Sequence, residues 1–240
     1  MLWQSDLCIL SNHGQKPIHR LRSMKMLRSA RTLRSVSTLV LAVSLSWVAS
    51  LGKCDEPGFS PLFDGRTFDG WEGNLDHFRI EANAIVAGTL KERIARNEFL
   101  CTKSEYSDFE LRLKFKLLGK GANAGVQIRS QRIPNHHEVR GYQADLGDGW
   151  WGSLYDESRR NKILAAADKA VIAEVLKPDD WNDYTIRCEG PRIQLWINGR
   201  QTIDYTEPDD KIERTGIIGV QIHGGPPSEA WYKDLRIKKL

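Results

Sequence analysis

The residues best suited to chemistry gather in one segment, residues 141–157, which reads GYQADLGDGWWGSLYDE. It contains four glycines, two adjacent tryptophans, two tyrosines, a glutamine and four acids. The apolar faces of sugar rings stack on tryptophan and tyrosine, while carboxylates and amides bind sugar hydroxyl groups. Glycines let a ligand approach the backbone closely. The pattern predicts a cleft for a carbohydrate or a small polyol; the alternative is a glycine-rich hairpin whose tryptophans belong to the core.

Polar side chains recur on one phase of the strand alternation in three segments, residues 123–130 (NAGVQIRS), 142–145 (YQAD) and 221–225 (QIHGG). Alternate residues of a strand face the same side of a sheet, so these side chains would share one concave face if the strands lie side by side. The alternative is a solvated outer face, but such faces usually carry lysine, glutamate and threonine.

The candidate site combines these segments. The candidates for catalysis are His223, Arg129, His137, Tyr155 and Asp156. The candidates for substrate binding are Gln127, Gln143, Asp145, Trp150, Trp151, Glu157 and Gln221, with Trp150 or Trp151 as the wall of the pocket.

Two further clusters allow more than one interpretation. His136, His137 and Glu138 could bind a divalent metal, the one cofactor that the sequence suggests. Adjacent residues of an extended chain point opposite ways, however, so this pair would need a third ligand. His137 or Glu138 could instead transfer protons at the rim of the cleft. The second cluster, Tyr155, Asp156 and Glu157 with Arg159 and Arg160, could surround a developing oxyanion or form a surface loop held by weak ion pairs.

Several common chemistries lack their motifs. The sequence has no G-x-S-x-G elbow, no P-loop and no dinucleotide-binding fingerprint. Serine-nucleophile hydrolysis, phosphoryl transfer and nicotinamide chemistry therefore have no support.

The elements that must position the site are strands. Residues 109–118 (FELRLKFKLL) alternate apolar and charged side chains, and residues 184–188, 193–197, 217–222 and 231–237 show the same period. Asn198-Gly199 predicts a tight hairpin turn. Only residues 165–176 have room for a short helix, which Pro178 would end. The pattern predicts an all-β, two-sheet antiparallel jelly-roll sandwich over residues 55–240, as a single domain.

The first 52 residues have a different composition. They carry seven Lys or Arg against one acid, whereas the other 188 residues carry 28 basic and 30 acidic residues. The basic charge belongs to this leader and indicates no nucleic-acid partner. An apolar run at residues 36–48 and small residues after it are typical of a signal peptide, with translation starting at Met24 or Met26. The run is shorter than the roughly 20 residues of a spanning helix.

The leader therefore predicts a protein that is secreted, periplasmic or on the cell surface, with no membrane span after cleavage. Lys53 before Cys54 argues against a lipoprotein. Cys188 falls on the inward phase of its strand, which favours a buried thiol, and a Cys54–Cys101 disulfide is an alternative for an exported protein.

Several motifs in order resemble the 3-keto-disaccharide hydrolase family. They are FDGR with Gly70-Trp71, DFELRLKFKL, NAGVQIRS, residues 141–157, WNDYTIRCEGPRIQLWINGR and GVQIHGGPP. The resemblance covers residues 58–240. It implies a concanavalin-like jelly roll, export, and action on glycosides oxidised at C3.

The chemistry of such glycosides suits these residues. A ketone at C3 acidifies the proton on C2, so a base can form an enediolate, and the substituent at C1 then leaves by elimination. The base would be His137 or His223, the electrophile Arg129 or a metal, and the acid Tyr155 or Asp156. The alternatives are a non-catalytic carbohydrate-binding module and a cell-surface domain that binds proteins.

The export hypothesis makes a direct prediction. N-terminal sequencing of protein recovered from the cell envelope of its host should give a first residue between about Ala49 and Asp55, because signal peptidase cuts after small residues. An intact Met1 or Met24 in that protein would contradict it.

Overall fold

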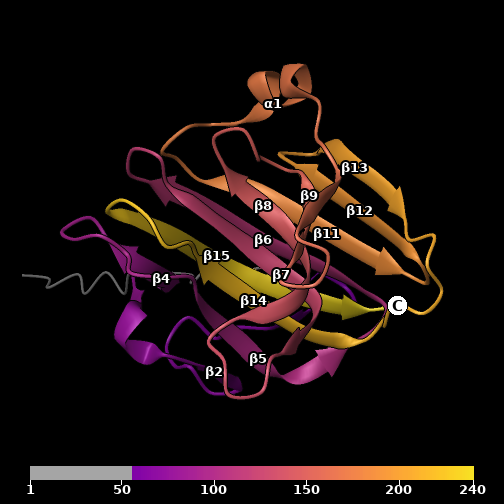
Figure 1. The fold of residues 1–240 in the computed structure, drawn as a ribbon, viewed down its shortest axis with the longest axis horizontal. Coiled ribbons are helices and arrows are strands. Elements are labelled where there is room, and N and C mark those ends of the chain that lie inside the picture. The colour runs from indigo at the N-terminus through magenta and orange to yellow at the C-terminus, as the bar shows by residue number, and fades with distance from the viewer. Residues whose placement is uncertain (1–55) are drawn as a thin grey trace, which may run out of the picture. The chain divides into compact units, whose positions relative to one another are not determined.

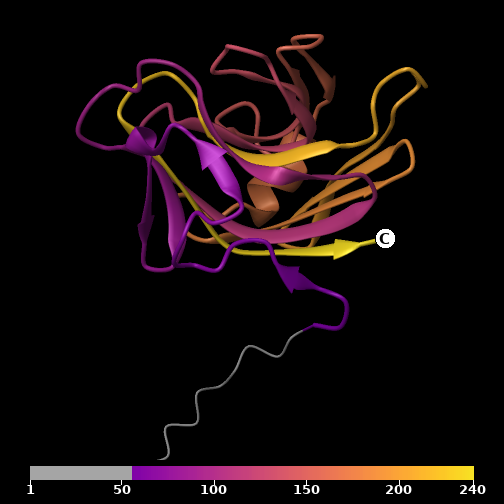
Figure 2. The ribbon, with the colours of Figure 1, turned by 90° about the horizontal axis from the view of Figure 1, so that it is seen from below.

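The computed structural model describes residues 56–240. The predicted signal peptide, its start at Met24 or Met26, and Cys54 lie outside the described residues. In the described part, two antiparallel sheets pack face to face, as Figures 1 and 2 show, with the C-terminal strand in the lower layer of Figure 2.

The first sheet, here called sheet A, has the strand order β13-β12-β11-β6-β15-β4-β3, with β1 paired to β15. Its strands are β13 (Arg200–Thr206), β12 (Arg192–Ile197), β11 (Asn182–Glu189), β6 (Phe109–Leu118), β15 (Ser228–Lys239), β4 (Ala84–Thr89), β3 (Phe78–Glu81) and β1 (Ser60–Pro61). Sheet B has the order β10-β9-β8-β7-β14-β5-β2. Its strands are β10 (Lys162–Ala165), β9 (Leu154–Glu157), β8 (Val139–Gly147), β7 (Asn123–Arg132), β14 (Gly216–Ile222), β5 (Glu98–Tyr106) and β2 (Trp71–Gly73). A 3-10 helix, η1 (Leu75–His77), precedes β3.

The predicted alternation fills the space between the sheets. In β6 every second residue from Phe109 to Leu117 is buried, while the residues between them are half-buried. In sheet B, Val126 and Ile128 of β7 and Val220 of β14 face the same core. The predicted fold class, an antiparallel two-sheet jelly-roll sandwich with one short helix, is confirmed.

The hairpin and the helix follow local rules. Asn198 and Gly199 both have positive φ, 48° and 81°, as a two-residue hairpin turn requires. Helix α1 (Lys169–Val175) is shorter than residues 165–176, because Asp168 caps it by accepting a hydrogen bond from the amide of Ala170. The residues before this cap belong to β10 and its connection. In Figure 1, α1 lies at one end of the sandwich.

A bulge in β7 changes the direction of Arg129. The pairing of β7 with β8 shifts register between Ile128 and Gln131, and Arg129 has a φ of 46°. A bulge inserts a residue that breaks the alternation of faces. The prediction that Arg129 shares a face with Gln127 is therefore wrong, and Ser130 takes that place, with its hydroxyl donating to Gln127 Oε1 at 2.8 Å.

Both described cysteines, Cys101 and Cys188, are buried free thiols. Burial raises the pKa of each to about 12, so neither is a reactive thiolate near neutral pH. The structure therefore agrees with the buried thiol expected at Cys188.

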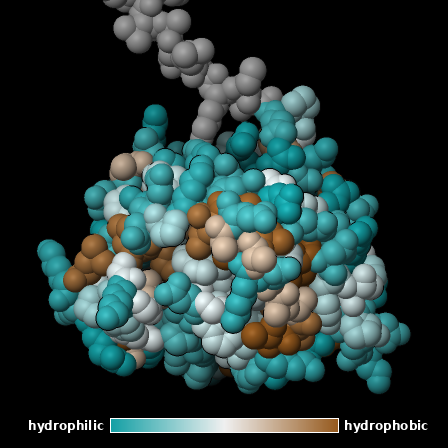
Figure 3. Space-filling view, turned by 90° about the horizontal axis from the view of Figure 1, so that it is seen from above, coloured by the Kyte–Doolittle hydropathy of each residue, from teal (hydrophilic) through white to brown (hydrophobic). Residues whose placement is uncertain are grey.

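The surface is mostly hydrophilic where Figure 3 views it, with hydrophobic residues in small separate groups. Within residues 56–240, no helix has the length and apolarity needed to cross a membrane.

Candidate functional site

The outer face of sheet B carries a small cavity of about 150 Å³. Its lining consists of Asn123, Gln143, Asp145, Trp150, Tyr155, Glu157 and His223. Six of these seven were singled out from the sequence. The strands β7, β8 and β9 lie side by side, and β14 pairs with β7, so the polar positions of separate segments meet as the alternation predicts.

A row of hydrogen-bonded amides holds Asp145 in this cavity. Gln127 Nε2 donates to Gln143 Oε1, and Gln143 Nε2 donates to Asp145 Oδ1 at 2.6 Å. Gln143 lies across Gly125, where an added Cβ would come within 2.6 Å of the Gln143 side chain. Only glycine leaves room for this arrangement. Gln127 is fully buried beneath the cavity, so its role is to orient Gln143 rather than to line the site.

Burial dominates the acidity of the two carboxyl groups. It raises the pKa of Asp145 to about 7, against the hydrogen bond from Gln143 and with help from the charge of Glu157. Burial likewise raises the pKa of Glu157 to about 7, and the charge of Glu138 adds to the effect. Near neutral pH each carboxyl group is therefore available both as an acid and as a base.

His223 faces the cavity with a defined tautomer. Its Nδ1 lies 2.7 Å from the carbonyl oxygen of Gly224, which can only accept a hydrogen bond, so Nδ1 carries the proton. In the neutral ring, Nε2 is then an unprotonated base. The backbone amide of His223 donates to the carbonyl of Asn123 at 3.0 Å, which fixes the end of β14 against β7.

Tyr155 and Trp150 complete the lining. Tyr155 pairs with Gln143 across β9 and β8, and burial followed by the charges of Glu157 and Asp145 raises its phenol pKa. The phenol therefore stays protonated and can donate a hydrogen bond. Trp150 is 38% exposed in the turn that follows β8, where a ring can cover one face of a bound sugar.

Four residues predicted for the site lie elsewhere. Arg129 ties β7 to sheet A, donating to the carbonyls of Ser107 and Gly190 and to Asp108 Oδ1, each at 2.7 Å. Asp156 is completely buried and pairs with Arg159 and Arg160. Neither lines the cavity, because Arg129 follows the bulge and Asp156 falls on the strand phase opposite to Tyr155 and Glu157.

Trp151 and His137 are the other two. Trp151 stacks on the core ring of Phe115, with centroids 6.0 Å apart, and donates to Asp148. His137 lies in the connection between β7 and β8 and lines a different, wider cavity. Gln221 has the predicted facing but is fully buried, and both polar atoms of its side chain lack a partner among the described residues.

Asn123 is the residue that sequence reasoning missed. It stands on the same alternation phase as Gly125 and Gln127 in NAGVQIRS, so the signal was present in the segment. Among residues 56–240, no group of three or more His, Cys, Asp or Glu is arranged to hold a metal ion. The lining of the cavity itself offers acid, base and hydrogen-bonding groups.

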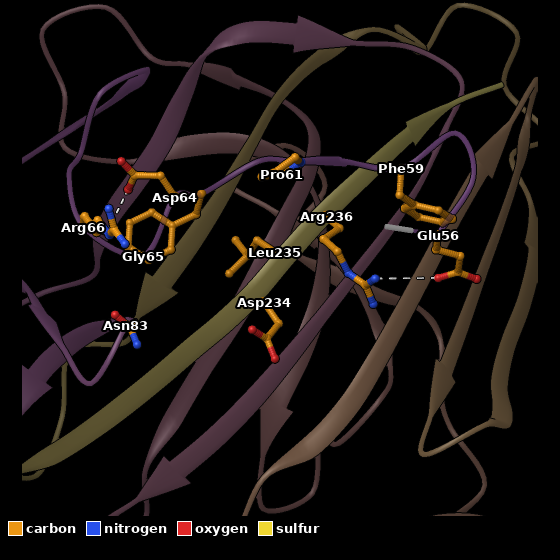
Figure 4. A pocket seen from close by; sticks show the side chains of 11 residues that line it. Glu56, Phe59, Pro61, Asp64, Gly65, Arg66, Asn83, Asp234, Leu235 and Arg236 are labelled. Carbon is orange, nitrogen blue, oxygen red and sulfur yellow. Dashed lines mark hydrogen bonds and ion pairs between the residues drawn. The ribbon is translucent and has the colours of Figure 1, made fainter. Parts of the chain in front are cut away.

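A separate hollow of about 500 Å³ adjoins β1 and β15 in sheet A (Figure 4). The FDGR motif borders it, but Asp64 uses its carboxylate within its own turn, accepting from the amides of Arg66 and Thr67. This hollow contains none of the predicted site residues.

Comparisons with known proteins agree with the β-sandwich fold. A family model described as the 3-keto-alpha-glucoside-1,2-lyase-like domain matches residues 58–238. The chain belongs to this family of carbohydrate-active, glycosyl hydrolase-like domains, which confirms the resemblance seen in the sequence. No curated protein matches the chain.

Solved structures share the fold at low identity. One, from Parabacteroides distasonis ATCC 8503 and assigned provisionally as a glycosyl hydrolase, has 19% identity over 76% of this chain and 94% of its own, with a TM-score of 0.60. The carbohydrate-binding module CBM66 from Bacillus subtilis has 14% identity over 71% of this chain and 96% of its own, with a TM-score of 0.55.

The raised carboxyl pKa values make stability depend on pH. The pKa of Asp145 is about 7 in the folded chain against an ordinary value of 3.8, so the folded state binds the extra proton. This stability is fully present below pH 3.8 and is lost as pH rises through about 7. Asp145→Asn removes this dependence, so its stability relative to the wild type should increase between pH 5 and pH 8, by about 1.4 kcal/mol or more.

Urea unfolding at both pH values measures this difference, and Asp210→Asn, at an exposed acid, is the matched control. A variant that is less stable at pH 8, or changed equally at both pH values, would contradict the assignment.

Proposed function

We propose that this chain cleaves 3-keto-glucosides in the cavity on sheet B, by removing the C2 proton and eliminating the substituent at C1. One observation carries the proposal. A single cavity holds an imidazole with a free Nε2 and two carboxyl groups whose pKa values are about 7. Membership of the 3-keto-alpha-glucoside-1,2-lyase-like family supports the same chemistry.

The reaction needs a base, a donor for the enolate oxygen and an acid for the leaving oxygen. His223 Nε2 takes the proton from C2, and the electron pair left there forms the enediolate with the oxygen at C3. Tyr155 or a protonated carboxyl group donates a hydrogen bond to that oxygen. The C1–O bond then breaks as the C1–C2 double bond forms.

The second half of the reaction uses the acids. One of the two carboxyl groups, Asp145 or Glu157, gives its proton to the departing oxygen, because a group with a pKa near the working pH transfers protons well. Water then adds across the C1–C2 double bond: its oxygen bonds to C1 and its proton goes to the carboxylate, while the His223 imidazolium, which exchanges protons with solvent, protonates C2. Asn123 and Gln143 hold the hydroxyl groups of the ring.

The size of the cavity limits what it encloses. Sites for drug-sized ligands are roughly 300–1,000 Å³, whereas this one is about 150 Å³. It therefore suits one sugar ring, with the C1 substituent outside it. Export to the periplasm or cell surface, expected from the leader, would expose the protein to such glycosides.

A second candidate is a non-catalytic carbohydrate-binding module. The observation in its favour is that CBM66 shares the sandwich fold. A binding face, however, has no need for two buried carboxyl groups beside an imidazole, since burying ionisable groups destabilises the fold. The enzymatic function is therefore preferred.

His223→Ala tests the proposal. It should lower kcat/KM for methyl 3-keto-α-glucoside about 10²- to 10⁴-fold through loss of the base, while the thermal midpoint stays close to that of the wild type. The measurement is release of methanol, with unoxidised methyl α-glucoside as the control substrate. His77→Ala, at a half-buried histidine outside this cavity, is the control variant.

Two results would count against the proposal. A wild type that binds sugars without releasing methanol would support the binding module instead. Full activity in His223→Ala would remove this histidine as the base.

A further inference from the structure

A second, wider cavity of about 800 Å³ lies where β2, β5 and the connection between β7 and β8 meet. It is lined by Glu72, Gly73, Asn74, Arg96, Glu98, Phe99, Arg132, Asn135, His136 and His137. Nothing in the proposed chemistry uses these residues. Most of them are charged or polar, so the cavity is built for a hydrated, hydrogen-bonding group.

The two cavities lie along one row of sheet B. Asp145 pairs with Gly125, Gly125 with Gln221, and Gln221 with Phe99. Asp145 lines the first cavity and Phe99 the second. Three strand spacings separate them, roughly 14 Å, a distance that one extended ligand can span.

Glu138 also links the two cavities. Its Oε1 lies 3.4 Å from His137 Nε2, in the second cavity, and its Oε2 accepts from the hydroxyl of Ser158 at 3.0 Å. Ser158 directly follows Glu157, which lines the first cavity. Glu138 therefore contacts one residue of the second lining and the residue next in sequence to Glu157 of the first.

Gln221 supplies an independent observation. It lies in the row between Asp145 and Phe99, is fully buried, and neither its amide nitrogen nor its oxygen has a partner among the described residues. A buried amide left without hydrogen bonds is costly, and such groups normally bind water or a ligand. Gln221 lines neither cavity, so its unpaired amide marks the stretch of sheet B that separates them.

The lining of the second cavity has hydrogen-bonding capacity to spare. Arg96 uses only Nε, which donates to Glu98 Oε1 at 2.9 Å, so its terminal nitrogens have no partner among residues 56–240. Asn74 accepts from the amide of Asp76, which leaves its own amide nitrogen for a ligand. The ring of His136 stacks against that of His137, with centroids 4.4 Å apart.

We propose that the second cavity is the subsite for the leaving group, with Arg96 and His136 as the residues that select it. The first cavity holds the oxidised ring, and the C1 substituent extends past Gln221 toward Phe99. Neutral, polyhydroxylated leaving groups fit best, because both carboxylates of the lining already pair with arginines, Glu98 with Arg96 and Glu72 with Arg132. This inference rests on the proposed function, whose cavity it extends.

The test compares two substrates that share the same oxidised ring. A 3-keto-α-disaccharide reaches the second cavity, whereas methyl 3-keto-α-glucoside does not. Arg96→Ala and His136→Ala should each lower kcat/KM for the disaccharide about tenfold, the effect of losing a hydrogen bond to a charged or polar partner. In both variants kcat/KM for the methyl glucoside should stay within about twofold of the wild-type value.

Arg93→Ala is the matched control. Arg93 is an exposed arginine that lies, like Arg96, between β4 and β5, and it lines neither cavity. This variant should leave kcat/KM for both substrates unchanged. Equal losses on both substrates, or no loss on either, would overturn the subsite. A wild type that cleaves neither substrate would refute the proposed function itself, a result distinct from the loss of selectivity.

Discussion

The site depends on the absence of a side chain at Gly125. Gln143 lies across this position, and an added Cβ would come within 2.6 Å of it. Gln143 in turn donates to Asp145 and accepts from Gln127, so the glycine allows the whole row of amides to form. Without that row, Asp145 would be a buried carboxyl group with no hydrogen-bond donor, which is among the more destabilising arrangements in a protein.

Sheet A fixes the position of this row from behind. The hydroxyl of Tyr232, on β15, lies 2.7 Å from the carbonyl oxygen of Gln221 and 3.2 Å from that of Gly125. Arg129 makes a second connection, from β7 to Asp108 and Gly190 at the end of sheet A. The core therefore positions two of the strands that carry the site, although neither contact enters the cavity.

The sequence predicted what depends on strand alternation and missed what depends on its interruptions. Gln143 and Asp145 meet because both lie on the outward phase of β8, and His223, which directly follows β14, lies beside Asn123 at the same cavity. Arg129 does not join them, because the bulge after Ile128 turns its side chain away from that face. Strand alternation in a single sequence gives no sign of such a bulge. The prediction also placed Tyr155, Asp156 and Glu157 together, although one strand cannot present three consecutive residues on the same face.

Other features required the tertiary structure. Trp151 is set apart from its neighbour Trp150 by stacking on Phe115, which comes from the other sheet. The second cavity exists because the connection between β7 and β8 reaches β2, where Arg132 donates to the carbonyl of Glu72 at 2.6 Å. Contacts between residues so distant in sequence follow from packing, and periodicity contains no information about them.

Removal of the C2 proton is the central claim, and an isotope measures it most directly. The substrate is methyl 3-keto-α-glucoside with deuterium at C2, cleaved in ordinary water, and the readout is the fate of the label by mass spectrometry. We expect deuterium to appear in the solvent as methanol is released, with a slower reaction than for the unlabelled substrate. Release of methanol with all of the deuterium still on C2 would contradict the elimination, and with it the role of His223 as the base.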